Sequence, residues 1–224
     1  MNNVCVIIHG FGGGLKEIAY LKEFLQRNNQ TVETILLAGH GVSKKELGDS
    51  TYLEWLSSAD RAFRRITRQY DSVTLIGFSM GGLIATYLAN KYQAEKIVLV
   101  NTPVYFWNVQ VILKSVLQDL RQNRRDHIRY YQRAFARTPV RSGLQFLHIL
   151  AKGKEWFQHI KCPTLILQCR DDESVKPKSA AYIESKIKAE STLKYYEGGC
   201  HQIFSNACDC RESACRDILG FIKK

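Results

Sequence analysis

Two kinds of apolar pattern alternate along the chain. Short, unbroken runs of β-branched and other apolar residues predict strands that are buried on both faces, as in a parallel sheet. Longer stretches with apolar residues every three or four positions predict amphipathic helices. The runs predict strands at 4–9, 31–37, 72–77, 96–100, 164–168 and 192–196. The periodic stretches predict helices at 15–27, 52–70, 81–92, 178–189 and 212–222.

Strands and helices that alternate in this order form a mostly parallel sheet with helices on both faces. The alternation stops between 103 and 157, where amphipathic stretches occur without a convincing strand. We therefore predict an α/β core from residues 1–102 and 158–224. Residues 103–157 are predicted to form a small helical cap inserted after the strand at 96–100. The length of 224 residues suits one such domain.

A G-x-S-x-G pentapeptide, Gly77-Phe78-Ser79-Met80-Gly81, joins the predicted strand at 72–77 to the helix at 81–92. This strand–turn–helix context is the one in which the motif forms a nucleophile elbow. The sharp turn exposes the serine hydroxyl, and the glycines let strand and helix approach closely. We predict that Ser79 is the nucleophile. The alternative is a chance loop of the same composition.

A glycine-rich segment, residues 9–14, follows the first predicted strand. A nucleophilic serine in acyl transfer needs amide donors for the oxyanion. We predict that the N–H groups of Phe11 and Met80 supply them, and that Gly10 and Phe11 also line the substrate pocket. His9 is expected to hold the loop by hydrogen bonds. A phosphate-binding loop is the rival interpretation, but its lysine and hydroxyl residue are absent.

The base and its orienting acid should follow the late strands. Parallel α/β folds with a nucleophile elbow carry the catalytic triad in the chain order Ser, then Asp or Glu, then His. His201 is the one histidine after the strand at 192–196, so we predict it as the base. Asp171, Asp172 and Glu173 follow the strand at 164–168. We predict Asp172 as the acid, since Val175 would then anchor its loop. Asp171 is the alternative.

The motifs at 9–12, 77–82, 172–175 and 198–201 together resemble those of small bacterial carboxylesterases. These enzymes belong to the carboxylesterase/monoacylglycerol-lipase branch of the α/β-hydrolase superfamily. The resemblance covers nearly the whole chain and is weakest at 103–157 and 208–215. It implies a compact core, a small helical cap and Ser-Asp-His catalysis without metal or cofactor. The implied substrates are short- to medium-chain acyl esters or monoacylglycerols.

Two departures from that family concern the acid and the cap. Members often carry His before the catalytic Asp, where this chain has Asp171. The cap is also unusually basic: against three acids, it has ten bases, Lys114, Arg121, Arg124, Arg125, Arg129, Arg133, Arg137, Arg141, Lys152 and Lys154. The segment therefore carries +7 of the net charge of +11. We interpret this charge as a solvated helix face rather than a nucleic-acid surface, and leave acidic substrates or a membrane surface open.

The start of the cap is apolar and predicts contacts with the substrate. The residues concerned are Tyr105, Phe106, Trp107, Val109, Ile112 and Leu113. Caps over such sites decide which acyl and alcohol groups fit, and we predict Tyr105 and Trp107 as pocket residues. The alternative, that these side chains only pack the cap onto the core, stays open.

Seven cysteines and no recognisable signal peptide predict a cytoplasmic protein with reduced thiols. Cys208, Cys210 and Cys215 cluster soon after Cys200, but their spacing matches no standard zinc motif, so no metal is expected. No apolar run reaches the length of a bilayer span. The expected partner is a small-molecule ester, with no nucleic acid, and the expected assembly is a monomer or homodimer.

Three other functions remain compatible with these residues. The same triad serves thioesterases and acyltransferases, whose acceptors differ only in pocket detail. A hydrolase-like protein that binds a small ligand without turnover is a third possibility, against which an intact triad argues. We expect a serine carboxylic-ester hydrolase.

Overall fold

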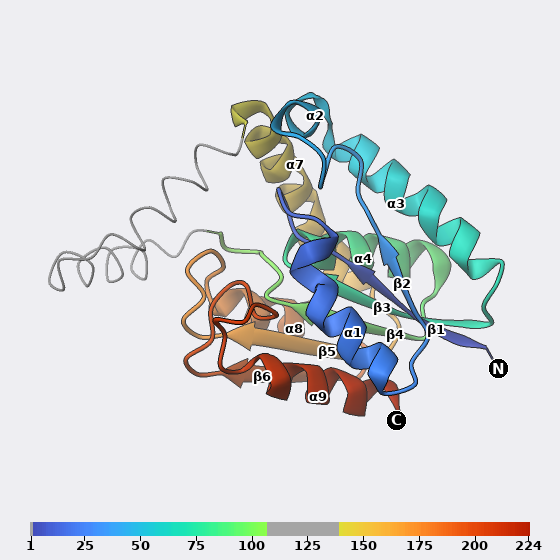
Figure 1. Ribbon diagram of the computed structural model, residues 1–224. Coiled ribbons are helices and arrows are strands. Elements are labelled where there is room, and N and C mark those ends of the chain that lie inside the picture. The colour runs from blue at the N-terminus through green and yellow to red at the C-terminus, as the bar shows by residue number, and fades with distance from the viewer. Residues whose placement is uncertain (1, 107–138) are drawn as a thin grey trace, which may run out of the picture.

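The computed structural model describes residues 2–106 and 139–224 (Figure 1). Six strands form one sheet in the order β2-β1-β3-β4-β5-β6, and every neighbouring pair is parallel. The strands are β1 (Asn3–Ile8), β2 (Val32–Ile35), β3 (Ser72–Phe78), β4 (Lys96–Val100), β5 (Thr164–Cys169) and β6 (Ser191–Tyr196). The predicted parallel α/β sheet is thus confirmed, with each strand within two residues of its expected ends.

Helices cover both faces of the sheet. Figure 1 shows α1 (Ala19–Arg27) and α9 (Arg211–Ile222) side by side on one face. The hydrophobic cluster on the other face draws on α3 (Tyr52–Thr67), α4 (Met80–Tyr92), α7 (Val140–Trp156) and α8 (Lys178–Lys186). Shorter elements are η1 (Leu15–Ile18), α2 (Lys44–Asp49) and η2 (Phe157–His159).

The apolar strands are explained by these two layers. In β1, Val4, Val6 and Ile8 belong to the cluster beneath α3 and α4, whereas Cys5 and Ile7 belong to the cluster beneath α1 and α9. Side chains of a strand alternate between faces. A strand covered on both sides therefore needs apolar residues at consecutive positions, which is the pattern that predicted it.

One helix escaped the sequence interpretation. The helix α2 has six residues and a single buried side chain, Leu47, so it has no apolar periodicity to detect. Its start is fixed locally, because the Ser43 side chain accepts a hydrogen bond from the Glu46 N–H.

The described residues cover only part of the predicted cap. The helix α7 lies inside the predicted cap at 103–157 and packs against α4. Residues 107–138 lie outside the described residues, so the division into core and cap stays a prediction. Among helices of the described residues, none combines the length and apolar character that a bilayer span requires.

The strand order decides where a site can form. From β1 the chain moves to one side for β2 and then to the other side for β3, so the order reverses between β1 and β3. In open parallel sheets, ligands bind beyond the carboxyl ends of the strands at such a switch point. The glycine-rich loop follows β1 and Ser79 follows β3, which brings both to this place.

Candidate active site

Ser79 occupies a strained turn between β3 and α4. Its backbone has φ 53° and ψ −124°, a conformation that costs free energy for a residue with a side chain. The turn is fixed on both sides. The Ser79 N–H donates to the Val100 carbonyl at 2.8 Å, and the Gly82 N–H donates to the Ser79 carbonyl at 2.9 Å.

The glycines of the motif are required by close backbone contacts. A Cβ atom at Gly77 would lie 2.4 Å from the Gly81 carbonyl oxygen. A Cβ atom at Gly81 would lie 2.2 Å from the Ile8 carbonyl oxygen. Because backbone atoms cannot swing aside as a flexible side chain does, only glycine fits at either position. The nucleophile-elbow geometry expected from G-x-S-x-G is therefore present.

The three residues predicted as a triad lie in one hydrogen-bonded chain. Ser79 Oγ is 3.0 Å from His201 Nε2, and His201 Nδ1 is 2.8 Å from Asp172 Oδ2. A carboxylate can only accept, so Nδ1 carries the proton and Nε2 accepts from the serine hydroxyl. Asp172 is fully buried, and its Oδ1 accepts the N–H groups of Ser174 at 2.8 Å and Val175 at 2.7 Å.

The neighbouring carboxylates hold the loop that carries His201. Asp171 Oδ2 accepts the Gly198 N–H at 2.9 Å, and Glu173 Oε2 accepts the His201 N–H at 3.0 Å. Of the three candidate acids, Asp172 is therefore the one that contacts the imidazole. Asp171 and Glu173 instead fix the backbone on which the imidazole stands.

The His201 imidazole is subject to opposing influences on its pKa. Burial alone would lower the pKa, because a charged ring is poorly solvated inside the protein. The carboxylates of Asp172, Glu173 and Glu17 outweigh burial and raise the pKa above its ordinary value. The site thus favours an imidazolium once a proton has been taken up, which is what a general base needs.

The glycine-rich loop is held beside Ser79 by His9. The Leu37 N–H donates to His9 Nε2 at 3.1 Å, so His9 Nδ1 carries the proton and donates to the Gly10 carbonyl at 2.8 Å. Burial lowers the pKa of His9 to about 4, so the ring is neutral at pH 7. A Cβ atom at Gly10 would lie 3.2 Å from Ser79 Cβ. His9 therefore has the structural role expected of it.

The Phe11 ring begins a row of aromatic contacts toward the cap. It stacks on Phe146 of α7 with centroids 4.9 Å apart and contacts Trp55 of α3 at 5.7 Å. Phe106 meets the same Phe146 ring at 4.9 Å. Phe106, from the apolar start of the predicted cap, and Phe146, from α7, thus both belong to this row.

Tyr105 and Trp107 were also predicted to line the substrate pocket. The Tyr105 ring contacts Tyr182 of α8 at 5.8 Å and lies beneath the Lys178 ammonium group at 4.3 Å. These contacts anchor Tyr105 to α8. Trp107 lies outside the described residues. Both remain predictions as pocket residues.

Asn101 is a site residue that the sequence interpretation missed. It follows β4 in a left-handed conformation, φ 45°, and is fully buried. Its Oδ1 accepts the Cys169 N–H at 2.9 Å, and its Nδ2 donates to the His201 carbonyl at 2.9 Å and the Cys200 carbonyl at 3.3 Å. An asparagine directly after a buried strand was the available signal, since asparagine tolerates this conformation.

Glu17 is the second missed residue. Its Oε2 accepts the Gly10 N–H at 3.2 Å, and its Oε1 accepts Gln202 Nε2 at 2.9 Å. One side chain therefore joins the glycine-rich loop to the His201 loop. Burial raises the pKa of Glu17, although its hydrogen bonds oppose that effect. No motif marks this residue in the sequence.

A strained serine at the switch point of a parallel sheet, bonded to a histidine and a buried aspartate, defines the α/β-hydrolase class. A family model described as alpha/beta hydrolase fold matches residues 3–152, and the chain belongs to this family. A second model, described as serine aminopeptidase S33, matches residues 108–207. The fold predicted from the sequence is confirmed.

Two relatives match most of the chain. A carboxylesterase of Bacillus subtilis (strain 168) is 23% identical over 98% of this chain and 92% of its own length. A thermostable monoacylglycerol lipase of Bacillus sp. (strain H-257) is 26% identical over 82% of this chain and 76% of its own. The predicted resemblance to the carboxylesterase/monoacylglycerol-lipase branch is confirmed by these relatives.

A comparison with solved structures finds the same fold. A structure from work on LipS and LipT, two metagenome-derived lipolytic enzymes, superimposes with a TM-score of 0.81 at 23% identity. It covers 99% of this chain and 94% of that chain. At this identity, the likeness establishes the shared fold.

Proposed function

We propose that this protein is a serine carboxylic-ester hydrolase that works through an acyl-enzyme on Ser79. The observation that carries the proposal is the chain of hydrogen bonds from Ser79 through His201 to Asp172. A serine hydroxyl is a weak nucleophile until a base takes its proton, and the base needs an acid that fixes its tautomer. His201 lies at hydrogen-bond distance from Ser79 as the base, and Asp172 lies at hydrogen-bond distance from His201 as the acid.

In the proposed first step, Ser79 Oγ attacks the ester carbonyl while His201 Nε2 takes the hydroxyl proton. Asp172 accepts the hydrogen bond from Nδ1 and stabilises the imidazolium. The imidazolium then gives its proton to the departing alkoxide, which leaves as an alcohol. In the second step, His201 takes a proton from water and hydroxide attacks the acyl-enzyme. The imidazolium then returns that proton to Ser79 Oγ as the acid is released.

The oxyanion formed in each step needs donors, and we assign them to the Phe11 and Met80 N–H groups. Met80 is the first residue of α4, where helix amides lack partners within the helix. Phe11 follows Gly10, whose backbone lies against Ser79. Helix N-termini favour negative charge, so α4 also supports the developing oxyanion.

The proposed substrates are short- to medium-chain acyl esters, with monoacylglycerols among them. Two observations support an apolar acyl group: Phe11, Phe106 and Phe146 form a row of rings beside the glycine-rich loop, and the two relatives carry the names carboxylesterase and monoacylglycerol lipase. Gly10, Tyr105 and Trp107 complete the proposed pocket. A cytoplasmic location fits seven free thiols.

The test uses a fluorophosphonate probe and a series of nitrophenyl esters of increasing acyl length. We expect wild type to be labelled and to turn over the shorter esters, and Ser79→Ala to lose labelling and at least about 1,000-fold in kcat. Acyl-coenzyme A thioesters serve as the comparison substrates. A wild-type protein that neither labels nor cleaves any ester would overturn the proposal, and cleavage of thioesters alone would make the protein a thioesterase.

A further inference from the structure

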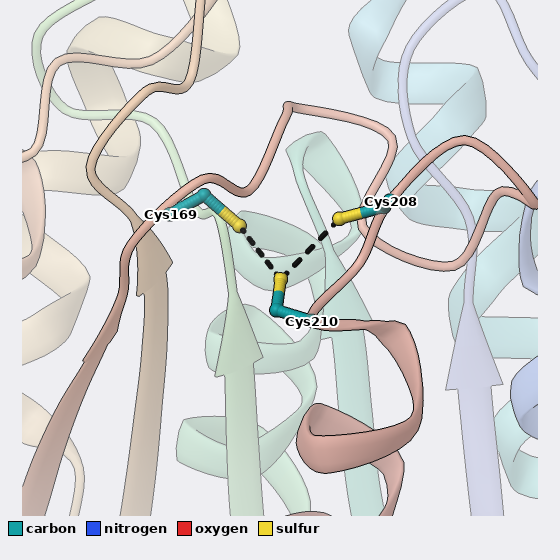
Figure 2. Close-up of side chains that lie close together, drawn as sticks. All are labelled: Cys169, Cys208 and Cys210. Atoms are coloured by element: carbon teal, nitrogen blue, oxygen red, sulfur yellow. Dashed lines mark hydrogen bonds between the residues drawn. The ribbon is translucent and has the colours of Figure 1, made fainter.

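Three cysteine thiols gather at one point (Figure 2). Cys169 ends β5, Cys208 lies in the loop after His201, and Cys210 directly precedes α9. The sulfur atoms of Cys169 and Cys210 are 3.8 Å apart, and those of Cys208 and Cys210 are 3.3 Å apart. All three sulfurs lie within 4.8 Å of one another.

The membership of this cluster differs from the grouping that the sequence suggested. Cys208 and Cys210 stand close to Cys215 in the sequence, and that spacing matched no zinc motif. Cys215 is buried on α9 and does not belong to the cluster. Its place is taken by Cys169, which stands 41 positions before Cys210 in the sequence, because β5 ends where α9 begins.

The sulfur spacing matches what a thiophilic cation requires. With metal–sulfur bonds of about 2.3 Å, two thiolates on one cation lie about 3.8 to 4.0 Å apart. The Cys169–Cys210 separation of 3.8 Å falls in this range, the Cys208–Cys210 separation of 3.3 Å lies somewhat below it, and the third pair is within 4.8 Å. Cys210 also stands at the N-cap of the twelve-residue helix α9, where the helix dipole favours a thiolate.

We propose that Cys169, Cys208 and Cys210 form a three-thiolate site for one thiophilic d10 cation, of which Zn²⁺ and Cd²⁺ are the divalent examples. On binding, each thiol releases its proton to solvent and its sulfur donates a lone pair to the cation, with no change of oxidation state. A water molecule completes a tetrahedral set. This proposal replaces the expectation of no metal drawn from sequence spacing.

The site has a direct connection to the loop that carries the proposed base. A Cβ atom at Gly199 would lie 2.5 Å from Cys169 Sγ and 2.8 Å from Cys210 Sγ, so the Gly199 backbone rests on the sulfurs. His201 follows two residues later. A cation that joins the three sulfurs therefore braces this loop from below, and stabilises the folded protein by mass action.

The experiment titrates Cd²⁺ into the reduced full-length protein in anaerobic buffer and follows the thiolate-to-cadmium absorption band in the ultraviolet. We expect the band to saturate at one equivalent of Cd²⁺ and to disappear when Zn²⁺ competes. Cys210→Ser and Cys208→Ser should each weaken Cd²⁺ binding at least about tenfold, or about 1.4 kcal/mol. Cys215→Ser is the matched control, a buried cysteine nearby that should bind as wild type does.

Three results would overturn the site. They are the absence of a band while all seven thiols remain titratable, a band that both Cys208→Ser and Cys210→Ser leave unchanged, and a Cys215→Ser loss equal to that of Cys210→Ser. Circular dichroism shows whether each variant folds. The absorption measurement needs no esterase activity, and Ser79→Ala should bind Cd²⁺ as wild type does. The test of the metal site is therefore independent of the test of the proposed hydrolase function.

Discussion

Ser79 and His201 meet at 3.0 Å, but the two segments that carry them are held in different ways. The Ser79 turn is held by backbone packed on backbone, with Gly77 and Gly81 at positions where a single added carbon would collide with main-chain atoms. The His201 loop is held by polar side chains. Asp171, Glu173 and Asn101 each hydrogen-bond to its main chain.

This difference has a consequence for how the two segments respond to change. The elbow packs directly on the main chain of the sheet, so disrupting the elbow destabilises the whole fold. Side-chain hydrogen bonds are worth about 0.5 to 1.5 kcal/mol each and are separately removable. We therefore expect changes at the elbow to act on folding, and changes around His201 to act on the reaction while the fold persists.

The largest effect is expected from Gly81→Ala. Its Cβ would meet the Ile8 and His9 carbonyl oxygens at 2.2 and 2.7 Å, which forces α4 away from β1. We expect a loss above about 4 kcal/mol in the free energy of unfolding, measured by denaturant titration. Gly220→Ala is the control, since a Cβ there meets nothing within 4 Å and lies in α9. It should stabilise by about 0.5 to 1 kcal/mol. Equal stability in both variants would contradict the packing account.

The next largest effect compares the two adjacent aspartates. Asp172→Asn replaces an acceptor with an amide that stabilises the wrong imidazole tautomer, so we expect kcat to fall by about 10,000-fold. Asp171→Asn keeps an amide oxygen to accept the Gly198 N–H and should lose no more than about tenfold. Steady-state kinetics on one nitrophenyl ester measures both. A greater loss in Asp171→Asn would transfer the role of acid to Asp171.

A smaller effect is expected at Asn101, where two substitutions separate backbone from side chain. Asn101→Gly tolerates φ 45° and loses only the hydrogen bonds, whereas Asn101→Ala also forces a side chain into the left-handed region. Both should lower kcat about 10- to 100-fold, because His201 is no longer fixed. Asn101→Ala should also be the less stable of the two in thermal unfolding.

The control for Asn101 is Asn90→Ala. Asn90 Nδ2 donates to the Trp156 carbonyl at 2.8 Å, away from the candidate site. This variant should lose stability by about 1 kcal/mol and keep its kcat. If Asn90→Ala lowered kcat as much as Asn101→Gly does, the role of Asn101 in positioning His201 would be refuted.

The smallest effect is a change in pH dependence. Glu173→Gln keeps an oxygen to accept the His201 N–H but removes a charge that raises the pKa of His201. Since the base acts unprotonated, kcat/KM rises with pH through this pKa. The acidic limb of the profile should therefore move to lower pH in Glu173→Gln. Glu197→Gln, whose carboxylate pairs with Arg170 instead, should leave it in place. A shift to higher pH would contradict the electrostatic account.

Local sequence determined the parts of the site that depend on neighbouring residues. The elbow is a contiguous strand–turn–helix segment, so Ser79 and its glycines are written in five consecutive positions. Chain order and the ends of strands then indicated His201 and Asp172. In the structure, His201 Nδ1 lies 2.8 Å from Asp172 Oδ2. Local pattern also predicted the six strands of the described residues, most of which are buried and therefore need apolar runs.

Only the tertiary structure decided which distant side chains meet. Asn101 reaches Cys169 and His201 across 68 and 100 residues of sequence, and Glu17 reaches Gln202 across 185. Cys169 joins Cys210 in the same way, which spacing between cysteines could not show. The physical reason is the parallel sheet. It gathers the carboxyl ends of its strands at one edge, but strand register and loop path decide which side chains there come within bonding distance.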